Sequence, residues 1–158
     1  MKDYGNEYYG VEMKIKLPWA LLGLILFSGC AGKPPEDLGL AGGRFLPCPN
    51  SPNCVSTQDD DARHAINPLP FLGTKEESRA RILKILAEMK RTTIVKKAEN
   101  YLHAVCMTAL FRFVDDVEFY FDDTNQVVHC RSASRVGYYD FGMNRKRMEN
   151  IASEYLRE

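Results

Sequence analysis

The sequence has little that would define an enzymatic activity. Its 158 residues carry 21 Lys plus Arg and 21 Asp plus Glu, so the formal net charge is zero. A neutral chain produces no extended positive field, which argues against a nucleic-acid partner. The chain also has no nucleophile elbow, no phosphate-binding glycine loop and no usual metal-ligand spacing. We therefore predict no nucleic-acid partner, no metal and no cofactor.

A hydrophobic run long enough to span a membrane is missing as well. The apolar stretch 17–27 is too short for a transmembrane helix. Two lysines precede it, and small residues and Cys30 follow it, which is the order of a secretory signal peptide. We predict that translation starts at Met13, that residues 13–29 are a signal peptide, and that residues 1–12 are a mis-called extension.

The segment Leu26–Cys30 resembles the lipobox of bacterial lipoproteins. In that family the cysteine thiol receives a diacylglycerol and becomes the first mature residue, which implies a lipid bilayer as partner through acylated Cys30. The alternatives are an uncleaved anchor, or a signal peptide in which the cysteine has no role. Ala31 stands where an aspartate would resemble a signal for inner-membrane retention. The resemblance therefore favours the outer membrane, with the protein facing the periplasm.

Glycine and proline dominate the residues that follow, and large apolar side chains are few. We expect residues 30–46 to form a flexible tether and residues 47–158 to form a single globular domain.

Two cysteines, Cys48 and Cys54, enclose a run of turn-forming residues at the start of that domain. In an exported chain such a close pair predicts a disulfide, worth about 2 kcal/mol in the chain-entropy model. The alternative is a metal site that includes His64, but the spacing is wider than in the usual zinc pair.

Periodicity then predicts an α+β domain. Thr74 and Glu77 resemble a capping box, and apolar residues at helical spacing extend the helix over 75–91. Four strand-like runs follow with short connections, which force antiparallel neighbours. Asp115 and Asp116 interrupt the third run and predict a β-bulge. The runs cover residues 93–98, 101–108, 110–121 and 127–132.

Alternation along the runs sorts the side chains onto two faces. One set should be covered by helices, giving a four-stranded antiparallel sheet covered on one face by two helices, a two-layer sandwich. That set comprises Leu102, Ala104, Cys106, Val117, Phe119, Phe121, Val128 and Cys130. Whether Cys106 and Cys130 form a bridge or stay as free core thiols is left open by the pattern.

A last helix follows Asp140, with Asn144 as the expected N-cap and an apolar stripe that ends at Leu156. Three consecutive cations, residues 145–147, occupy its first turn, where positive charge opposes the helix dipole. Such a local conflict is typical of a functional or specially paired site.

Several segments resemble the family called domain of unknown function 1499. They are the turn from Cys48 to Ser56, the segments 101–104 and 113–119, and the stretch from Arg131 to Gly137 that continues through Asp140, Gly142, Asn144, Arg145 and Arg147. Val105 departs from the pattern, since an acidic residue is expected there. The resemblance implies a pattern but no established reaction, so it transfers no catalytic residue.

The arginine-rich exit from the last strand is the surface of greatest interest. Arg131, Arg135, Arg145 and Arg147, with the amides of Ser132 to Ser134, could converge on a phosphate, carboxylate or acidic glycan. The protein would then be a membrane-anchored, non-catalytic binding or scaffold module of the envelope, with an anionic ligand or an envelope protein as partner. Alternatively, the arginines pair with Asp115, Asp116, Glu118 or Asp140 and join the sheet to the helix. A third possibility is an enzyme that acts on an envelope polymer through His103, His129, Glu118 and Asp116.

Overall fold

The computed structural model describes residues 33–36, 38–109 and 112–157. The extension 1–12, the signal peptide 13–29 and the lipidated Cys30 lie outside these residues and stay predictions. Within the described part of the chain, no helix has both the length and the apolar character needed to cross a bilayer.

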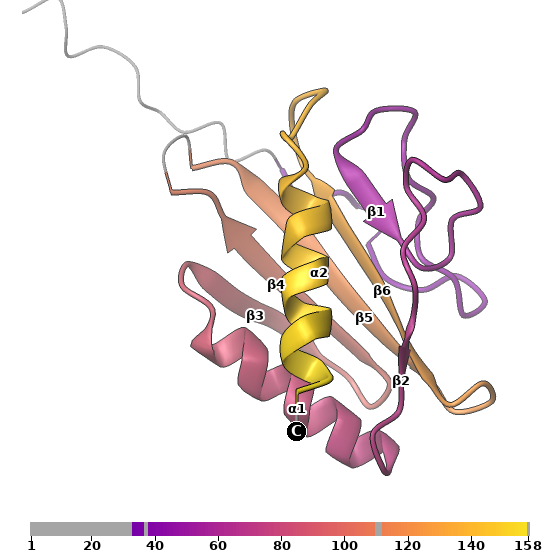
Figure 1. Ribbon diagram of the computed structural model, residues 1–158. Coiled ribbons are helices and arrows are strands. Elements are labelled where there is room, and N and C mark those ends of the chain that lie inside the picture. The colour runs from indigo at the N-terminus through magenta and orange to yellow at the C-terminus, as the bar shows by residue number, and fades with distance from the viewer. Residues whose placement is uncertain (1–32, 37, 110–111, 158) are drawn as a thin grey trace, which may run out of the picture.

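The domain is built on one antiparallel sheet (Figure 1). Its strands lie in the order β1-β6-β5-β4-β3, and β2 also pairs with β6. The elements are β1 (Cys54–Ser56), β2 (Leu69–Pro70), α1 (Lys75–Glu88), β3 (Thr92–Lys97), β4 (Tyr101–Met107), β5 (Val114–Asp122), β6 (Val127–Ser134) and α2 (Met143–Tyr155).

The α+β class is confirmed, but the described sheet has six strands and not four. The two additional strands, β1 and β2, contain three and two residues. Segments this short carry no readable alternation, and they become strands only because they pair with the outer edge of β6. The sequence pattern therefore could not reveal them.

Both helices lie on the same face of the sheet, so the domain has two layers (Figure 1). All eight residues predicted for the covered face are buried members of the core. Ile82, Leu86, Ile151 and Tyr155 contribute to the same core from the helices and are at most 1% exposed. The face assignment is therefore confirmed.

The capping box of α1 is confirmed as well. The Thr74 hydroxyl accepts a hydrogen bond from the Glu77 amide at 3.1 Å, and the Glu77 carboxylate accepts one from the Thr74 amide at 2.7 Å. The helix ends at Glu88, earlier than predicted, because Met89 is already extended and Arg91 has a φ of 57°. Arg81 binds the backbone carbonyls of Tyr155 and Arg157, which attaches α1 to the end of α2.

The bulge predicted at Asp115 and Asp116 is wrong. Both residues keep regular pairing with β4 and with β6, and the irregularity of the sheet lies in β3, between Ile94 and Lys96. Adjacent aspartates interrupt an apolar pattern, but they fit a regular strand when each carboxylate has a charged partner.

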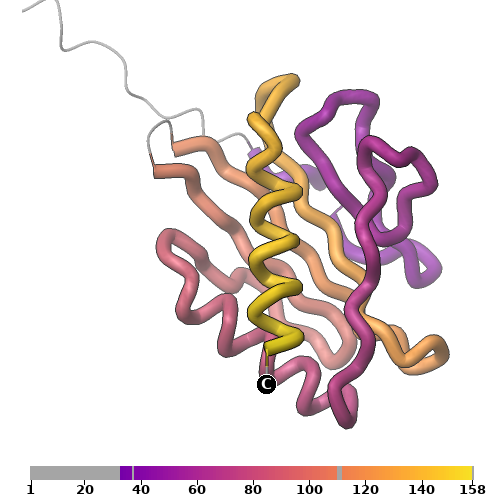
Figure 2. Tube along the Cα trace, viewed as in Figure 1, coloured from indigo at the N-terminus to yellow at the C-terminus, as the bar shows by residue number. Residues whose placement is uncertain are grey.

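The face of the sheet away from the helices is covered in part by residues 38–46 (Figure 2). The amide of Gly39 donates to Glu118 at 3.0 Å, and Phe45, which is 6% exposed, donates from its amide to Gln58. Residues 30–46 were predicted to be a tether, but the part from 38 onward belongs to the domain. Glycine suits this segment because Gly39, Gly42 and Gly43 have φ of 124°, 58° and 78°, which other residues rarely adopt.

The predicted disulfide between Cys48 and Cys54 is present. Its thiols are therefore not available to a metal, and His64 instead bonds the Cys54 carbonyl at 2.9 Å. Cys106 and Cys130 are free and buried, because β5 lies between the strands that carry them.

Replacing both Cys48 and Cys54 by alanine should lower the free energy of unfolding by about 2 kcal/mol, since the short ring restricts the unfolded chain. Urea denaturation followed by circular dichroism measures the change. A reducing agent should bring the wild-type midpoint toward that of the variant and leave the variant unaffected. Equal midpoints for wild type and variant without reductant would contradict a stabilising role.

Candidate functional site

Asp115 and Asp116 are neighbours near the start of β5, the middle strand of the sheet, and each is 1% exposed. Because side chains alternate along a strand, their carboxylates point to opposite faces. Asp115 faces the helices with Cys106 and Ser134 as its cross-strand neighbours, whereas Asp116 faces the other side. Two separate polar clusters result, one on each face.

The cluster on the helix face joins β5, β6 and α2. Arg147 forms an ion pair with Asp115, and the Ser134 hydroxyl donates to the same carboxylate at 2.6 Å. Ser132 donates to the Asn144 side-chain oxygen at 2.6 Å, and Arg147 donates to both of these residues. Asp115 thus compensates the positive charge of Arg147 that the sequence placed unfavourably near the start of α2.

Asn144 is not the N-cap of α2, as had been predicted. That position is Gly142, and the carboxylate of Asp140 accepts hydrogen bonds from the amides of Gly142 and Asn144. Asn144 is instead 1% exposed, and its side-chain amide binds Asp140, Ser134 and the carbonyl of Asn53. A buried amide with this many partners fixes the start of α2 on the sheet.

The cluster on the opposite face is centred on Asp116. It accepts hydrogen bonds from His103 at 2.7 Å and from two nitrogens of Arg135, each at 2.9 Å. Burial by itself would raise the pKa of Asp116, but the hydrogen bonds from His103 and Arg135 outweigh burial and hold that pKa below its usual value. The same contact raises the pKa of Arg135.

Glu118 extends this second cluster along β5. It forms an ion pair with Arg131 at 3.0 Å and accepts hydrogen bonds from the Tyr101 hydroxyl at 2.7 Å and from the Gly39 amide. Burial and the neighbouring Glu118 carboxylate raise the pKa of Tyr101. The Arg131 Nε atom is buried without a hydrogen-bond partner among the described residues.

The four arginines therefore do not meet at one point. Arg131 and Arg135 serve one face of the sheet, and Arg147 serves the other. Arg145 lies apart from both clusters, where it donates to the backbone carbonyls of Ala65 and Arg63. In this geometry three of the four guanidinium groups join secondary-structure elements through carboxylates.

The groups considered for catalysis are held in similar contacts. His103 is 8% exposed and is occupied by Asp116. His129 lies 3.0 Å from the Thr57 hydroxyl and 3.7 Å from Asp122, and burial lowers its pKa. The Asp122 carboxylate also accepts hydrogen bonds from the turn that follows β5, so it has a structural role.

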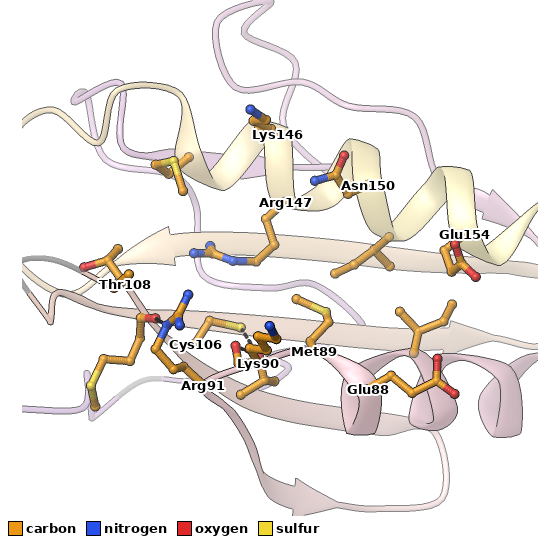
Figure 3. Close-up of a pocket in the computed structure, with 16 residues that line it drawn as sticks. Glu88, Met89, Lys90, Arg91, Cys106, Thr108, Lys146, Arg147, Asn150 and Glu154 are labelled. Carbon is orange, nitrogen blue, oxygen red and sulfur yellow. Dashed lines mark hydrogen bonds between the residues drawn. The ribbon is translucent and has the colours of Figure 1, made fainter.

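A groove of about 560 Å³ opens beside the helix-face cluster, between the end of α1, the adjoining ends of β3 and β4, and α2 (Figure 3). Its floor contains Ile85, Met89, Cys106 and Ile151. Burial raises the pKa of the Cys106 thiol, which keeps that group neutral and a poor nucleophile.

The groove is electrically polarised. Figure 3 shows Lys90, Arg91 and Arg147 toward one end, whereas Glu88 and Glu154 lie at the other. No carboxylate of the described chain lies within ion-pair distance of Lys90 or Arg91; Arg147 is paired with Asp115. Sequence reasoning missed Lys90 and Arg91, because only the packing of α1 beside α2 brings them near Arg147.

Sequence reasoning also gave no role to Asn53. Its carbonyl binds Asn144, and its side-chain amide donates to the carbonyl of Gly137 at 2.6 Å. The disulfide turn, the exit of β6 and the start of α2 thus meet at this residue. Its place between Pro52 and Cys54 at the end of the cysteine ring is the only signal that the sequence offers for it.

A family model described as "Protein of unknown function (DUF1499)" matches residues 44–154. The chain belongs to this family. The matched DUF1499 region begins within the N-terminal segment that packs on the sheet and includes every named strand and nearly all of α2. A comparison with curated proteins finds no match.

Stability should fall in acid, and Asp116 should account for part of the fall. Its folded pKa lies below the unfolded value of about 4, so the folded state binds fewer protons and its advantage is lost as pH falls through the folded pKa. Asp116→Asn should cost about 3 kcal/mol near neutral pH and flatten the dependence below about pH 4.

Urea midpoints near neutral pH and in acid measure this effect. Asp60→Asn is the matched control, because Asp60 is exposed and has no ion pair among the described residues. A variant at Asp116 with the same acid sensitivity as wild type would refute the assignment.

Proposed function

We propose that this DUF1499 chain is a lipid-anchored envelope protein whose domain binds an anionic ligand and does not catalyse a reaction. Residues 13–29 direct export, and acylated Cys30 attaches the protein to the outer membrane, facing the periplasm. The order of charged, apolar and small residues before Cys30 supports this. The Cys48–Cys54 disulfide suits an oxidising compartment as well.

The groove beside Arg147 is the observation that carries the binding function. Its size is within the range of small-molecule sites, and it has an apolar floor with charged groups at its ends. Arg91 has a φ of 57°, where a residue other than glycine costs about 1 kcal/mol. Its Nε donates to the Met107 carbonyl at 3.3 Å, which holds the guanidinium at the groove without a carboxylate partner among the described residues. A strained residue placed in this way supports a role in binding.

The polarity of the groove defines the class of ligand. A phosphate or carboxylate is favoured at the end with Lys90 and Arg91 and is repelled by Glu88 and Glu154 at the other end. The floor between the two ends favours an apolar chain. We therefore expect an anionic amphiphile with a single hydrophobic tail.

An enzyme acting on an envelope polymer is less well supported. His103 and Asp116 are bound to one another and to Arg135, and both are buried. The thiol in the groove is kept neutral by its surroundings. The Thr57 hydroxyl lies 3.0 Å from His129, but it also accepts a hydrogen bond from the Cys130 amide, which fits a structural link between the segment after β1 and β6.

Metabolic labelling with palmitate tests the anchor. The full-length protein should incorporate the label and fractionate with the outer membrane, whereas Cys30→Ser should do neither. A labelled Cys30→Ser protein, or an unlabelled wild type in the same host, would refute the anchor.

Calorimetric titration with dodecyl phosphate below its micellar concentration tests the groove. Lys90→Ala/Arg91→Ala should weaken binding by about 30-fold, since it removes two charge contacts that contribute about 1 kcal/mol each. Lys84→Ala/Lys97→Ala, which removes equal charge outside the groove, should bind like wild type. Equal weakening in both variants would reduce the effect to non-specific attraction and contradict the proposed site.

A further inference from the structure

The loop between β6 and α2, together with the first residue of α2, carries an exposed cluster of large apolar side chains; we call residues 137–143 the aromatic loop. Tyr138 is 70% exposed, Tyr139 59%, Phe141 82% and Met143 44%. In the described part of the chain, the other exposed large hydrophobic residues are only Val95, Phe113 and Leu156. Such a concentration within one short loop marks an interaction surface.

Hydrogen bonds hold the backbone of the aromatic loop in place, although its side chains are exposed. Asn53 binds the Gly137 carbonyl, and Asp140 binds the amide of Gly142. The rings of Tyr139 and Phe141 contact one another edge to face, with centroids 5.1 Å apart. The fold therefore holds these rings in solvent, although burial of such side chains is normally favoured.

Two cations without a carboxylate partner among the described residues, Arg145 and Lys146, lie beside the aromatic loop, whereas Arg135 and Arg147 are paired with Asp116 and Asp115. Asp140 is the only acidic residue between Arg135 and Arg147, and its carboxylate is turned toward the start of α2. Lys146 follows in the first turn of α2, is exposed, and points away from the sheet (Figure 3). Aromatic rings beside cations match the interface of an anionic bilayer, where rings occupy the headgroup level and cations meet phosphates.

We propose that the aromatic loop is a bilayer-contact surface, in which the side chains of Tyr139 and Phe141 enter the headgroup region of an anionic phospholipid membrane. This inference rests on the proposed lipid anchor, because the anchor keeps the domain beside a membrane. Nine residues lead from Cys30 to Gly39, which binds Glu118, and an extended chain of that length spans about 30 Å. The sheet from Glu118 to its end at Val114 is only about 13 Å long, so the loop and the anchor can reach the same bilayer.

Contact through this loop also orients the groove, with one end close to the membrane. Met143 belongs to the aromatic loop and lines the groove, and Arg147 follows one turn later. The cationic end of the groove therefore opens close to the surface that meets the membrane. An amphiphile that leaves the bilayer would encounter Arg91 and Arg147 first.

The test uses residues 31–158 without the acyl group, because the sheet, both helices and the disulfide all lie within residues 38–157. The chain has a single tryptophan, Trp19, which this fragment lacks, so Phe141→Trp adds a probe without background. With vesicles of phosphatidylethanolamine and phosphatidylglycerol, its emission should shift to the blue and be quenched by brominated lipid. Sedimentation with the same vesicles gives the partition coefficient.

Tyr139→Ser/Phe141→Ser should lower that partition coefficient by about 10- to 100-fold. Val95→Ser/Leu156→Ser is the control, since it removes two exposed apolar side chains elsewhere, 51% and 52% exposed, and should bind like wild type. Circular dichroism shows that each variant is folded.

Three outcomes would overturn the inference: no emission shift, equal partition of the two double variants, or self-association that the loop variant abolishes. The last would assign the loop to a second copy of the chain. The fragment carries no lipid, so a negative vesicle-binding result does not affect the palmitate labelling at Cys30. Equally, a negative labelling result leaves the vesicle-binding measurement interpretable.

Discussion

Two adjacent carboxylates near the start of the middle strand β5, those of Asp115 and Asp116, impose the main constraint on this fold. A buried charge is tolerated only with a close partner, and strand alternation sends these two charges in opposite directions. The chain after β6 must therefore supply a cation to each face: Arg135 directly after the strand, and Arg147 from α2. The position of α2 on the sheet follows from this requirement as well as from its apolar stripe.

Much of the fold could be predicted because its signals are local. The alternation in β4, β5 and β6 gave the covered face, and Thr74 with Glu77 gave the start of α1. The features that were missed depend on distant contacts. The edge strands β1 and β2 exist only against β6, and Gly39 becomes part of the domain only through Glu118 on the far face.

The candidate site was predicted as a set of residues but not as an arrangement. The parity of β6 already places Arg131 on the face opposite Val128 and Cys130, whereas the last helix, which carries Arg147, covers the face of those two residues, so a single clamp was excluded by the predicted layers. The geometry of α2 was not accessible in the same way, since its N-cap is a glycine in a left-handed conformation and not Asn144. The groove arises between elements far apart in sequence, and no local pattern encodes such a space.

The distribution of the cysteines has a consequence for oxidative folding. Cys48 and Cys54 are separated by only six positions, so their loop closes sooner and at lower entropic cost than any alternative connectivity with the strand cysteines. Cys106 and Cys130 are then buried on the strands either side of β5, and burial raises the pKa of both thiols, so neither readily forms the thiolate that would attack the disulfide. The native pairing is thus selected by proximity early in folding and protected from thiol exchange afterwards, without the help of a second disulfide.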